Sequence, residues 1–465
     1  MRGQRGPQRR LHFSGVAGAG MNTLAQLMAA WGHDVQGSDR AFDIGAQTGL
    51  AAKLRGLGIE LRPHDGAAIV PGIDTLIFSG AVEADTPELR AARELGIETI
   101  PRATLLADVV NGGSPSVAVA GTSGKTTVTA MVGWILRRAG IPATVLGGSA
   151  VLGEGPGGCF AAGPIGGPVV AEADESDGTL VGYRPDIGVV LNVSRDHTSL
   201  SELHAQFARF LDNSRTRLVN RACPEASRLT GRSDLRTFGN DSSADIPLTI
   251  VDVLPDRTAG VVGLEHGSIR IDLPLPGLHN LENAGAAAAI ATTLGVTPEA
   301  IRQALSDFPG VERRFEVVGV TATKIRVVDD YAHNAAKIAA TIAAAQTGSE
   351  RVIAVFQPHG FGPARSLRPE LRALLPEILR RQDRFCYAEI YYGGGAVVRD
   401  ISSRILAEDL ASLDCGYAPD HEAVRKWVAD AAGPGDTVLV MGARDPRRPD
   451  LARSIYHDLT QTAGD

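Results

Sequence analysis

The segment SVAVAGTSGKTTVTAMVGWILRRAG (116–140) constrains the fold more than any other part of the chain. Its first five residues are an apolar run typical of a buried strand, and the residues after the loop have helical spacing of apolar side chains. Backbone N–H groups of a Gly-rich loop at a helix N-terminus are suited to hold phosphate groups. The order of strand, loop and helix therefore predicts an α/β domain that binds a nucleotide.

Each residue of the loop is a candidate nucleotide contact. The set is Gly121, Thr122, Ser123, Gly124, Lys125, Thr126 and Thr127. Lys125, one of only five lysines in the chain, can reach the β- and γ-phosphates, and the Thr126 hydroxyl can bind Mg²⁺. Val119 stands where the longer form of this motif has Gly, so the loop is the shortened form. A Gly-rich turn with an exposed lysine is the alternative.

A second Gly-rich turn lies near the N-terminus, where residues 11–39 read as strand, turn, helix and strand. Gly15, Gly18 and Gly20 would let the backbone approach a pyrophosphate, and Asp39 could bind a ribose hydroxyl. Taken alone, this pattern suggests NAD and an oxidoreductase. A turn that binds no ligand is the other interpretation.

An acidic cluster follows the apolar segment at 168–171. Glu172, Asp174, Glu175 and Asp177 would repel one another unless a cation lay among them. His197 follows the next predicted strand, so Glu172 and His197 could share one metal ion beside the phosphates. A solvated acidic loop is the alternative.

The length of 465 residues corresponds to about three domains. The basic start MRGQRGPQRR has no apolar stretch after it and predicts a disordered leader (1–10). Breaks in the pattern at 107–116 and 309–319 divide the rest into domains at 11–110, 111–312 and 313–465. We expect an α/β protein with a Rossmann-like N-terminal domain, a central P-loop ATPase domain and a C-terminal Rossmann-like domain.

The formal charge of −7 disfavours a broad nucleic-acid or anionic-membrane surface. No apolar run reaches the roughly 18 residues of a membrane span. The four cysteines are scattered and form no C-x-x-C pair, which favours a cytoplasmic enzyme with reduced thiols. The oligomeric state stays open.

Ten segments occur in the order found in one family of enzymes. They are GVAGAGM, FSGAV, AGTSGKTT, AEADESDG, NVSRDH, GLHNLENAGAAAA, GVERRFE, DDYAHN, QPHG and GDTVLVMGAR. Together they resemble the Mur ligase family, and within it the branch that adds L-alanine to UDP-N-acetylmuramate. The resemblance implies an ATP- and Mg²⁺-dependent amide ligase of peptidoglycan synthesis. Such enzymes phosphorylate a substrate carboxylate and let an amine attack the acyl phosphate.

The resemblance also implies roles for individual residues. The implied catalytic residues are Lys125, Glu172, His197, Arg314 and His333, and the implied metal ligands are Thr126, Glu172 and His197. His279, Asn280, Asn283, Arg313 and Asp330 would join the loop in binding nucleotide. The UDP-sugar acid and the amine would contact Gly15, Gly18, Gly20, Asp39, Ser79, Tyr331, His359 and Arg365.

The chain departs from the family pattern mainly on the amine side. Asn334 and Lys337 replace a His and a Glu, and the first arginine after Gln-Pro-His is displaced to Arg365. We therefore hypothesise an amine other than L-alanine, with an acidic amino acid or a peptide as possibilities. The alternatives are a drifted L-alanine ligase, a recycling ligase that adds a peptide, and a nucleotide-binding regulatory paralogue.

Overall fold

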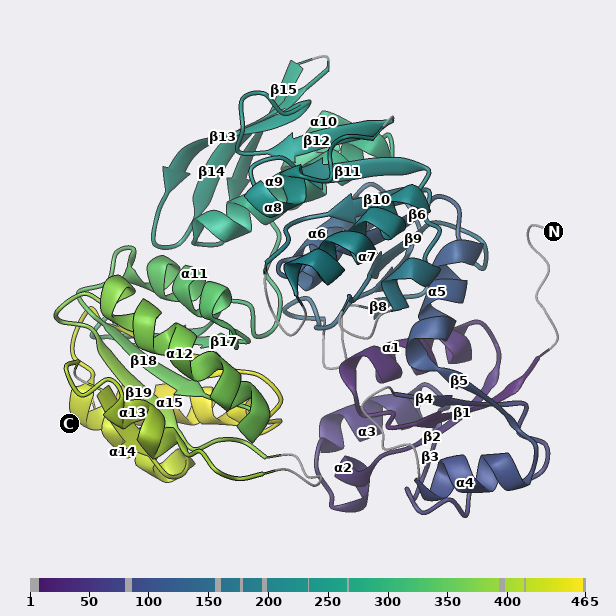
Figure 1. The fold of residues 1–465 in the computed structure, drawn as a ribbon, viewed down its shortest axis with the longest axis horizontal. Coiled ribbons are helices and arrows are strands. Elements are labelled where there is room, and N and C mark those ends of the chain that lie inside the picture. The colour runs from purple at the N-terminus through teal and green to yellow at the C-terminus, as the bar shows by residue number, and fades with distance from the viewer. Residues whose placement is uncertain are drawn as a thin grey trace. The chain divides into compact units, whose positions relative to one another are not determined.

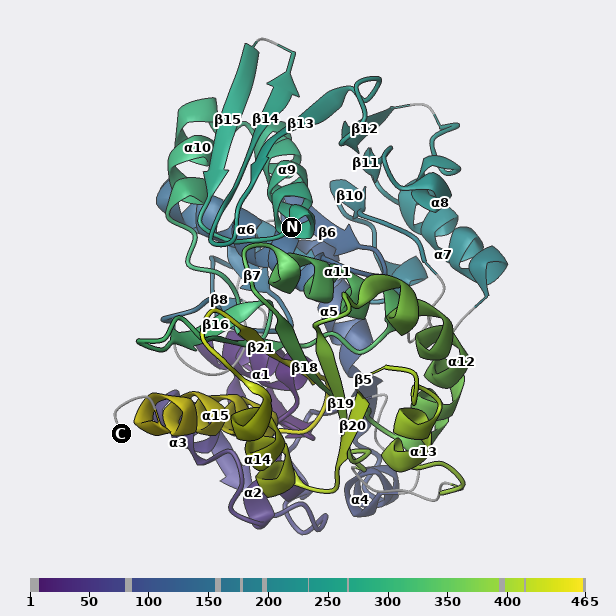
Figure 2. The same cartoon turned by 90° about the vertical axis from the view of Figure 1, so that its left-hand side faces the viewer.

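The computed structural model describes residues 8–79, 86–154, 160–175, 179–194, 199–232, 234–265, 267–392, 398–413 and 415–462. These residues form an α/β protein built on three sheets, which confirms the predicted fold class (Figures 1 and 2). The chain divides into two compact units. The first is drawn from 1–251, 259–273 and 281–309, and the second from 252–258, 274–280 and 310–465.

The N-terminal sheet is parallel, with strand order β3-β2-β1-β4-β5. Its elements are β1 (Arg10–Ser14), α1 (Ala19–Ala30), β2 (Asp34–Ser38), α2 (Arg40–Asp43), α3 (Thr48–Gly56), β3 (Glu60–Arg62), β4 (Thr75–Phe78), α4 (Pro87–Glu94), β5 (Glu98–Pro101) and α5 (Arg102–Gly112). Because the strand order reverses at β1, the Gly-rich turn after β1 lies where open parallel sheets bind ligands. β1 already includes Arg10, and α5 extends to Gly112, two residues past the expected boundary.

The central sheet has the order β15-β14-β13-β12-β11-β10-β6-β9-β7-β8. Its strands are β6 (Ser116–Ala120), β7 (Thr144–Leu146), β8 (Phe160–Ala161), β9 (Val169–Glu172), β10 (Ile187–Val190), β11 (Thr216–Asn220), β12 (Leu235–Gly239), β13 (Ile246–Val253), β14 (Thr258–Leu264) and β15 (Gly267–Leu273). Its helices are α6 (Lys125–Arg138), the 3-10 helix η1 (Thr179–Gly182), α7 (Leu200–Asp212), α8 (Pro224–Ser227), α9 (Leu278–Thr293) and α10 (Pro298–Ser306). β6 pairs in parallel with β9 on one side and β10 on the other. The polar segments that follow β9 and β10 therefore flank the predicted phosphate loop.

The C-terminal sheet has the order β16-β17-β21-β18-β19-β20, and only β16 is antiparallel to its neighbour among the described pairings. The elements are β16 (Glu316–Val320), β17 (Arg326–Asp330), α11 (Ala335–Gln346), β18 (Val352–Gln357), α12 (Phe361–Ile378), β19 (Arg384–Ala388), α13 (Ser403–Glu408), β20 (Cys415–Ala418), α14 (His421–Ala431), β21 (Thr437–Gly442) and α15 (Arg448–Thr462).

Successive residues of the C-terminal strands point to opposite faces of the sheet. Val328 packs with α11 and α12 on one face, whereas Val327 packs with α14 and α15 on the other. This doubly covered arrangement leaves the strand ends as the places where polar groups can gather. None of the helices in the described part of the chain is long and apolar enough to span a membrane.

Candidate active site

The phosphate loop between β6 and α6 depends on two glycines in the left-handed region. Gly121 has φ +136° and Gly124 has φ +84°. A Cβ atom on Gly121 would lie 3.0 Å from the backbone N of Asn192, and one on Gly124 would lie 2.5 Å from Oδ1 of Asn283. Only glycine fits either position, and Asn283, predicted to bind nucleotide, lies against the loop.

Asn192, in the segment that follows β10, holds the loop in place. Its Oδ1 accepts a 2.8 Å hydrogen bond from the backbone N of Ser123, and its Nδ2 donates to the Ser123 carbonyl at 3.0 Å. The backbone N of Ser194 donates to the Thr122 hydroxyl at 3.0 Å. Sequence reasoning did not assign Asn192 or Ser194, although both belong to the NVSRDH segment. Their signal was a run of polar residues directly after a buried strand.

Lys125 begins α6 and lies in an acidic environment. Its Nζ donates to Oε2 of Glu175 at 2.7 Å and lies 3.6 Å from Oδ1 of Asp174. Burial alone would lower the pKa of Lys125, but the carboxylates of Glu175, Asp174 and Glu172 outweigh burial and raise it. Lys125 is therefore a fixed cation at neutral pH.

The Thr126 hydroxyl and the Glu172 carboxylate meet next to Lys125. Thr126 Oγ1 donates to Glu172 Oε2 at 2.8 Å, and the backbone N of Gly148 donates to the same oxygen at 3.1 Å. Hydroxyl and carboxylate oxygens are the ligands that Mg²⁺ prefers, so this pair fits a magnesium site. The predicted third ligand, His197, and Asp177 lie outside the described residues. No group of three or more His, Cys, Asp or Glu side chains in the described ranges is arranged to hold a metal ion.

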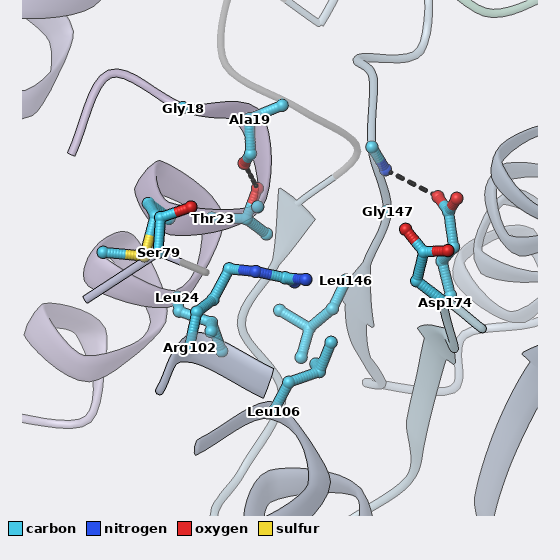
Figure 3. Close-up of a pocket in the computed structure, with 14 residues that line it drawn as sticks. Gly18, Ala19, Thr23, Leu24, Ser79, Arg102, Leu106, Leu146, Gly147 and Asp174 are labelled. Carbon is cyan, nitrogen blue, oxygen red and sulfur yellow. Dashed lines mark hydrogen bonds between the residues drawn. The ribbon is translucent and has the colours of Figure 1, made fainter. Parts of the chain in front are cut away.

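A cavity of about 280 Å³ extends from Glu172 to the N-terminal turn (Figure 3). Gly18, Gly20 and Ser79 line it together with Glu172 and Asp174. The structure thus brings three predicted substrate contacts and one predicted catalytic residue to the same cavity.

Arg102, the first residue of α5, enters the same cavity and was not predicted from the sequence. Figure 3 shows its side chain extending between Ser79 on one side and Leu146 on the other. A Cβ atom on Gly20 would lie 2.9 Å from Nη1 of Arg102, so the guanidinium lies against the turn. A cation at this point suits a phosphate or carboxylate group.

The other two predicted residues of the N-terminal turn have structural partners. Gly15 has φ +84°, and its backbone N donates to the Ser38 carbonyl at 2.8 Å. Asp39 accepts from the backbone N of Ala17 at 2.9 Å and from that of Ala41 at 2.8 Å. Asp39 therefore ties the turn to the start of α2, and its contact with a ribose stays a prediction.

A buried carboxylate, that of Glu88, lies next to the last residue of β2. Glu88 Oε1 is 3.1 Å from His12 Nε2, Oε2 is 3.2 Å from His64 Nδ1, and the Ser38 hydroxyl also donates to Glu88. Burial opposes ionisation, but hydrogen bonds from His12 and His64 hold the pKa of Glu88 well below its usual range. Ser38, the last residue of β2, links this network to the turn, because its hydroxyl donates to Glu88 and its carbonyl accepts from the backbone N of Gly15.

In the second unit, Arg313 and Arg314 lie next to the residues at the end of β17. Asp330 accepts hydrogen bonds of 2.7 Å from the backbone N atoms of Phe315 and Ala332. The guanidinium carbons of Arg313 and Arg314 lie 4.7 and 4.9 Å from the centre of the Tyr331 ring. Asp330 therefore orders the loop that carries both arginines.

The two predicted histidines follow neighbouring parts of the same sheet, His333 after β17 and His359 after β18. His333 Nδ1 is 2.9 Å from the Tyr331 carbonyl oxygen, and the His333 and His359 rings are 5.4 Å apart. Burial, reinforced by Lys337, holds the pKa of His333 well below its usual range, so it is neutral at pH 7. A neutral imidazole can accept a proton.

Three further predicted residues belong to the second unit. Burial lowers the pKa of His279, and the charge of Asp330 partly offsets it. Asn280 is buried and donates from Nδ2 to the Pro276 carbonyl at 2.8 Å. Arg365 lies in the first turns of α12 and forms an ion pair with Asp400 at the surface.

Three family descriptions match the chain. "Mur ligase family, catalytic domain" matches residues 10–113, "Mur ligase middle domain" matches 168–291, and "Mur ligase, glutamate ligase domain" matches 313–444. The chain is 33% identical to a UDP-N-acetylmuramate–L-alanine ligase of Xanthomonas oryzae, with 94% of this chain and 93% of the relative covered.

Two solved structures are similar along nearly the whole chain. The UDP-N-acetylmuramate–alanine ligase of Thermotoga maritima has a TM-score of 0.79 at 26% identity, covering 97% of this chain and 99% of that one. The murein peptide ligase of Psychrobacter arcticus has a TM-score of 0.70 with the same coverage. Its identity is 21%, so this second likeness concerns the fold alone.

Proposed function

The chain belongs to the Mur ligase family, and we propose that it is an ATP-dependent ligase of peptidoglycan precursor synthesis. In this proposal it joins an amino group to the carboxylate of UDP-N-acetylmuramate or a related acid. The observation that carries the proposal is the position of Glu172. It lines the cavity beside the Gly18–Gly20 turn and also accepts the hydrogen bond from Thr126 of the phosphate loop. A nucleotide phosphate and an acid substrate can therefore meet at one carboxylate.

The phosphate loop would hold ATP. Lys125 would exchange its contact with Glu175 for the γ-phosphate, whose negative charge it offsets. Thr126 and Glu172 would hold Mg²⁺, with His197 as the proposed third ligand, and the metal would neutralise phosphate charge as the phosphoryl group is transferred. In the cavity, Arg102 would bind an anionic group of the acid substrate.

The reaction would proceed in two steps. An oxygen of the substrate carboxylate attacks the γ-phosphorus, the bond to the β-phosphate oxygen breaks, and ADP and an acyl phosphate form. The amine nitrogen then attacks the acyl carbon, and inorganic phosphate leaves. Arg314 would contact the transferred phosphate, and neutral His333 could accept the proton that the amine loses.

The amine is proposed to differ from L-alanine. A site for a free amino acid needs a fixed cation for the carboxylate. Arg365, the displaced arginine of the QPHGFGPAR segment, forms an ion pair with Asp400. Lys337 adds a positive charge at the start of α11. An acidic amino acid or a peptide is therefore favoured, and an L-alanine ligase with relocated contacts is the alternative. Because ATP and UDP-linked acids are cytoplasmic metabolites, we expect the enzyme to act in the cytoplasm.

The test is a ligase assay with ATP, Mg²⁺ and UDP-N-acetylmuramate against L-alanine, L-glutamate, glycine, L-serine and short peptides. Amine-dependent phosphate release, with the ligated product identified by mass, would support the function. Absence of product with every amine would contradict it. A clear preference for L-alanine with kcat/KM of about 10⁴ M⁻¹s⁻¹ or more would overturn only the proposal on the amine.

A further inference from the structure

A buried ion pair joins the end of β17 to the start of α15. Nη2 of Arg448 lies 2.8 Å from Oδ1 of Asp329, and the two side chains are 0% and 1% exposed. Nη1 of Arg448 also donates to the Val440 carbonyl at 2.8 Å. Burial lowers the pKa of Arg448 to about 10, so it remains a cation at neutral pH.

The same carboxylate faces a second guanidinium. Nε of Arg313 is 3.8 Å from Oδ2 of Asp329, and Nη2 of Arg313 donates to the Gly442 carbonyl at 3.0 Å. Both arginines are thus fixed to the last residues of β21, and both lie next to Asp329. Burial raises the pKa of Asp329, and the charges of Arg448 and Arg313 oppose this shift and favour the carboxylate. Without the negative charge of Asp329, the guanidinium groups of Arg313 and Arg448 would repel each other in a buried environment.

Arg313 has a strained backbone that several contacts maintain. Its φ is +59°, and that of Phe315 is +52°, a region that residues other than glycine seldom adopt. The backbone N of Arg313 donates to Glu316 Oε2 at 2.9 Å, and its carbonyl accepts from the backbone N of Tyr331 at 2.8 Å. Strain of this kind is maintained where surrounding contacts fix a functional geometry.

Arg313, Tyr331 and Arg314 form one stack, since both guanidinium groups lie within 5 Å of the Tyr331 ring centre. Arg313 is anchored to β21 and lies next to Asp329, and Arg314 follows it directly in the chain. A shift of Arg313 would therefore move Tyr331 and Arg314 as well.

We propose that the buried Asp329–Arg448 pair is a positioning element that holds the Arg313–Tyr331–Arg314 stack so that Arg314 meets the transferred phosphate. The inference rests on the proposed ligase function. A buried ion pair by itself adds little to stability, because desolvation of the two charges offsets their attraction. The role of the pair is to fix the position of Arg313, and Arg313 in turn orients Arg314.

The experiment compares two matched variants of the same sheet. Asp329→Asn removes the positioning charge at the carboxyl end of β17. Asp436→Asn removes another buried aspartate, 1% exposed, which pairs with Arg351 at 2.7 Å just before β21 begins. The two substitutions are chemically identical and lie at opposite ends of the neighbouring parallel strands β17 and β21. Thermal melting and steady-state kinetics are measured for both, with an amine that the wild type uses.

We expect Asp329→Asn to lower kcat by about 10²-fold while KM for ATP changes by less than about threefold, because misplacement of a catalytic group acts on the transition state. Asp436→Asn should melt earlier but keep kcat within about threefold of the wild type. Equal kcat values for the two variants at equal loss of melting temperature would overturn the proposal. A wild type inactive with every amine would instead contradict the proposed function.

Arg448→Lys provides a second variant in case Asp329→Asn does not fold. Lysine keeps the charge but cannot contact Asp329 and Val440 through one planar group. A loss of kcat of about tenfold or more in a folded Arg448→Lys protein supports positioning. Full activity of this variant would overturn it.

Discussion

Thr126 Oγ1 lies 2.8 Å from Glu172 Oε2, which joins the phosphate loop to the cavity beside the N-terminal Gly-rich turn. The contact exists because β9 and β6 are parallel neighbours, so the end of one strand faces the loop after the other. The proposed magnesium site, phosphate site and substrate cavity therefore share a single carboxylate.

Gly148→Ala should weaken the proposed magnesium site. An added Cβ would lie 3.1 Å from Glu172 Oε2 and 3.3 Å from Thr126 Oγ1, so it would displace one of these oxygens. We expect the Mg²⁺ concentration for half-maximal activity to rise by about tenfold, a cost of about 1.4 kcal/mol. A magnesium titration of the ligase reaction measures it.

Gly49→Ala is the matched control, because nothing lies within 4 Å of a Cβ atom at this position of α3. It should leave the Mg²⁺ requirement unchanged. An unaltered titration for Gly148→Ala would remove the case for metal between Thr126 and Glu172.

Lys125→Ala should abolish turnover. The variant lacks the cation that offsets phosphate charge in the transition state, so we expect kcat to fall by about 10²-fold or more. The exposed Lys426→Ala on α14 controls for loss of a lysine elsewhere. Normal ATP-dependent ligation by a folded Lys125→Ala protein would contradict the assignment of the loop.

Arg102→Ala should act on the acid substrate and not on ATP. Loss of a charge-assisted hydrogen bond costs about 1.5–3 kcal/mol, so KM for the UDP-sugar acid should rise by about tenfold or more. KM for ATP should stay the same, and the exposed Arg93→Ala on α4 should change neither constant. A change in KM for ATP alone would show that Arg102 serves the nucleotide instead.

Glu88→Gln should make the free energy of unfolding less dependent on pH under acidic conditions. The folded-state pKa of Glu88 lies below its unfolded value, because the hydrogen bonds from His12 and His64 outweigh the effect of burial. Its ionisation therefore stabilises the fold above the unfolded pKa of about 4.3, and this contribution is lost as the pH falls. The variant should have a lower free energy of unfolding than the wild type at pH 6. This difference in free energy should become smaller towards pH 3.

Urea denaturation between pH 6 and pH 3 measures this difference in free energy. His64, whose pKa is raised chiefly by its hydrogen bond to Glu88, is charged throughout the acid part of that range. Glu60→Gln, at an exposed site on β3, should follow the wild type. A difference for Glu88→Gln that stays constant with pH would show that the Glu88 charge does not matter for stability.

The phosphate loop and the order of domains could be predicted from the sequence because their information is local. A loop such as Gly121–Thr127 is encoded by contiguous residues, and its glycines have the positive φ values that such a loop requires. The proximity of the polar residues at the ends of β9 and β10 could also be predicted, because parallel strands have their carboxyl ends at the same edge of the sheet. These local signals and the resemblance to the Mur ligases gave the fold class and most candidate residues.

The remaining partners came only from the tertiary structure. Arg102 reaches Gly20 because α5 packs against α1, and Arg448 reaches Asp329 because β21 lies beside β17 in the sheet. Single arginines in ordinary helix-forming segments carry no local pattern that marks them. Their roles arise from which strands become neighbours and which side chains are buried together, and hydrophobic packing of the whole chain decides that.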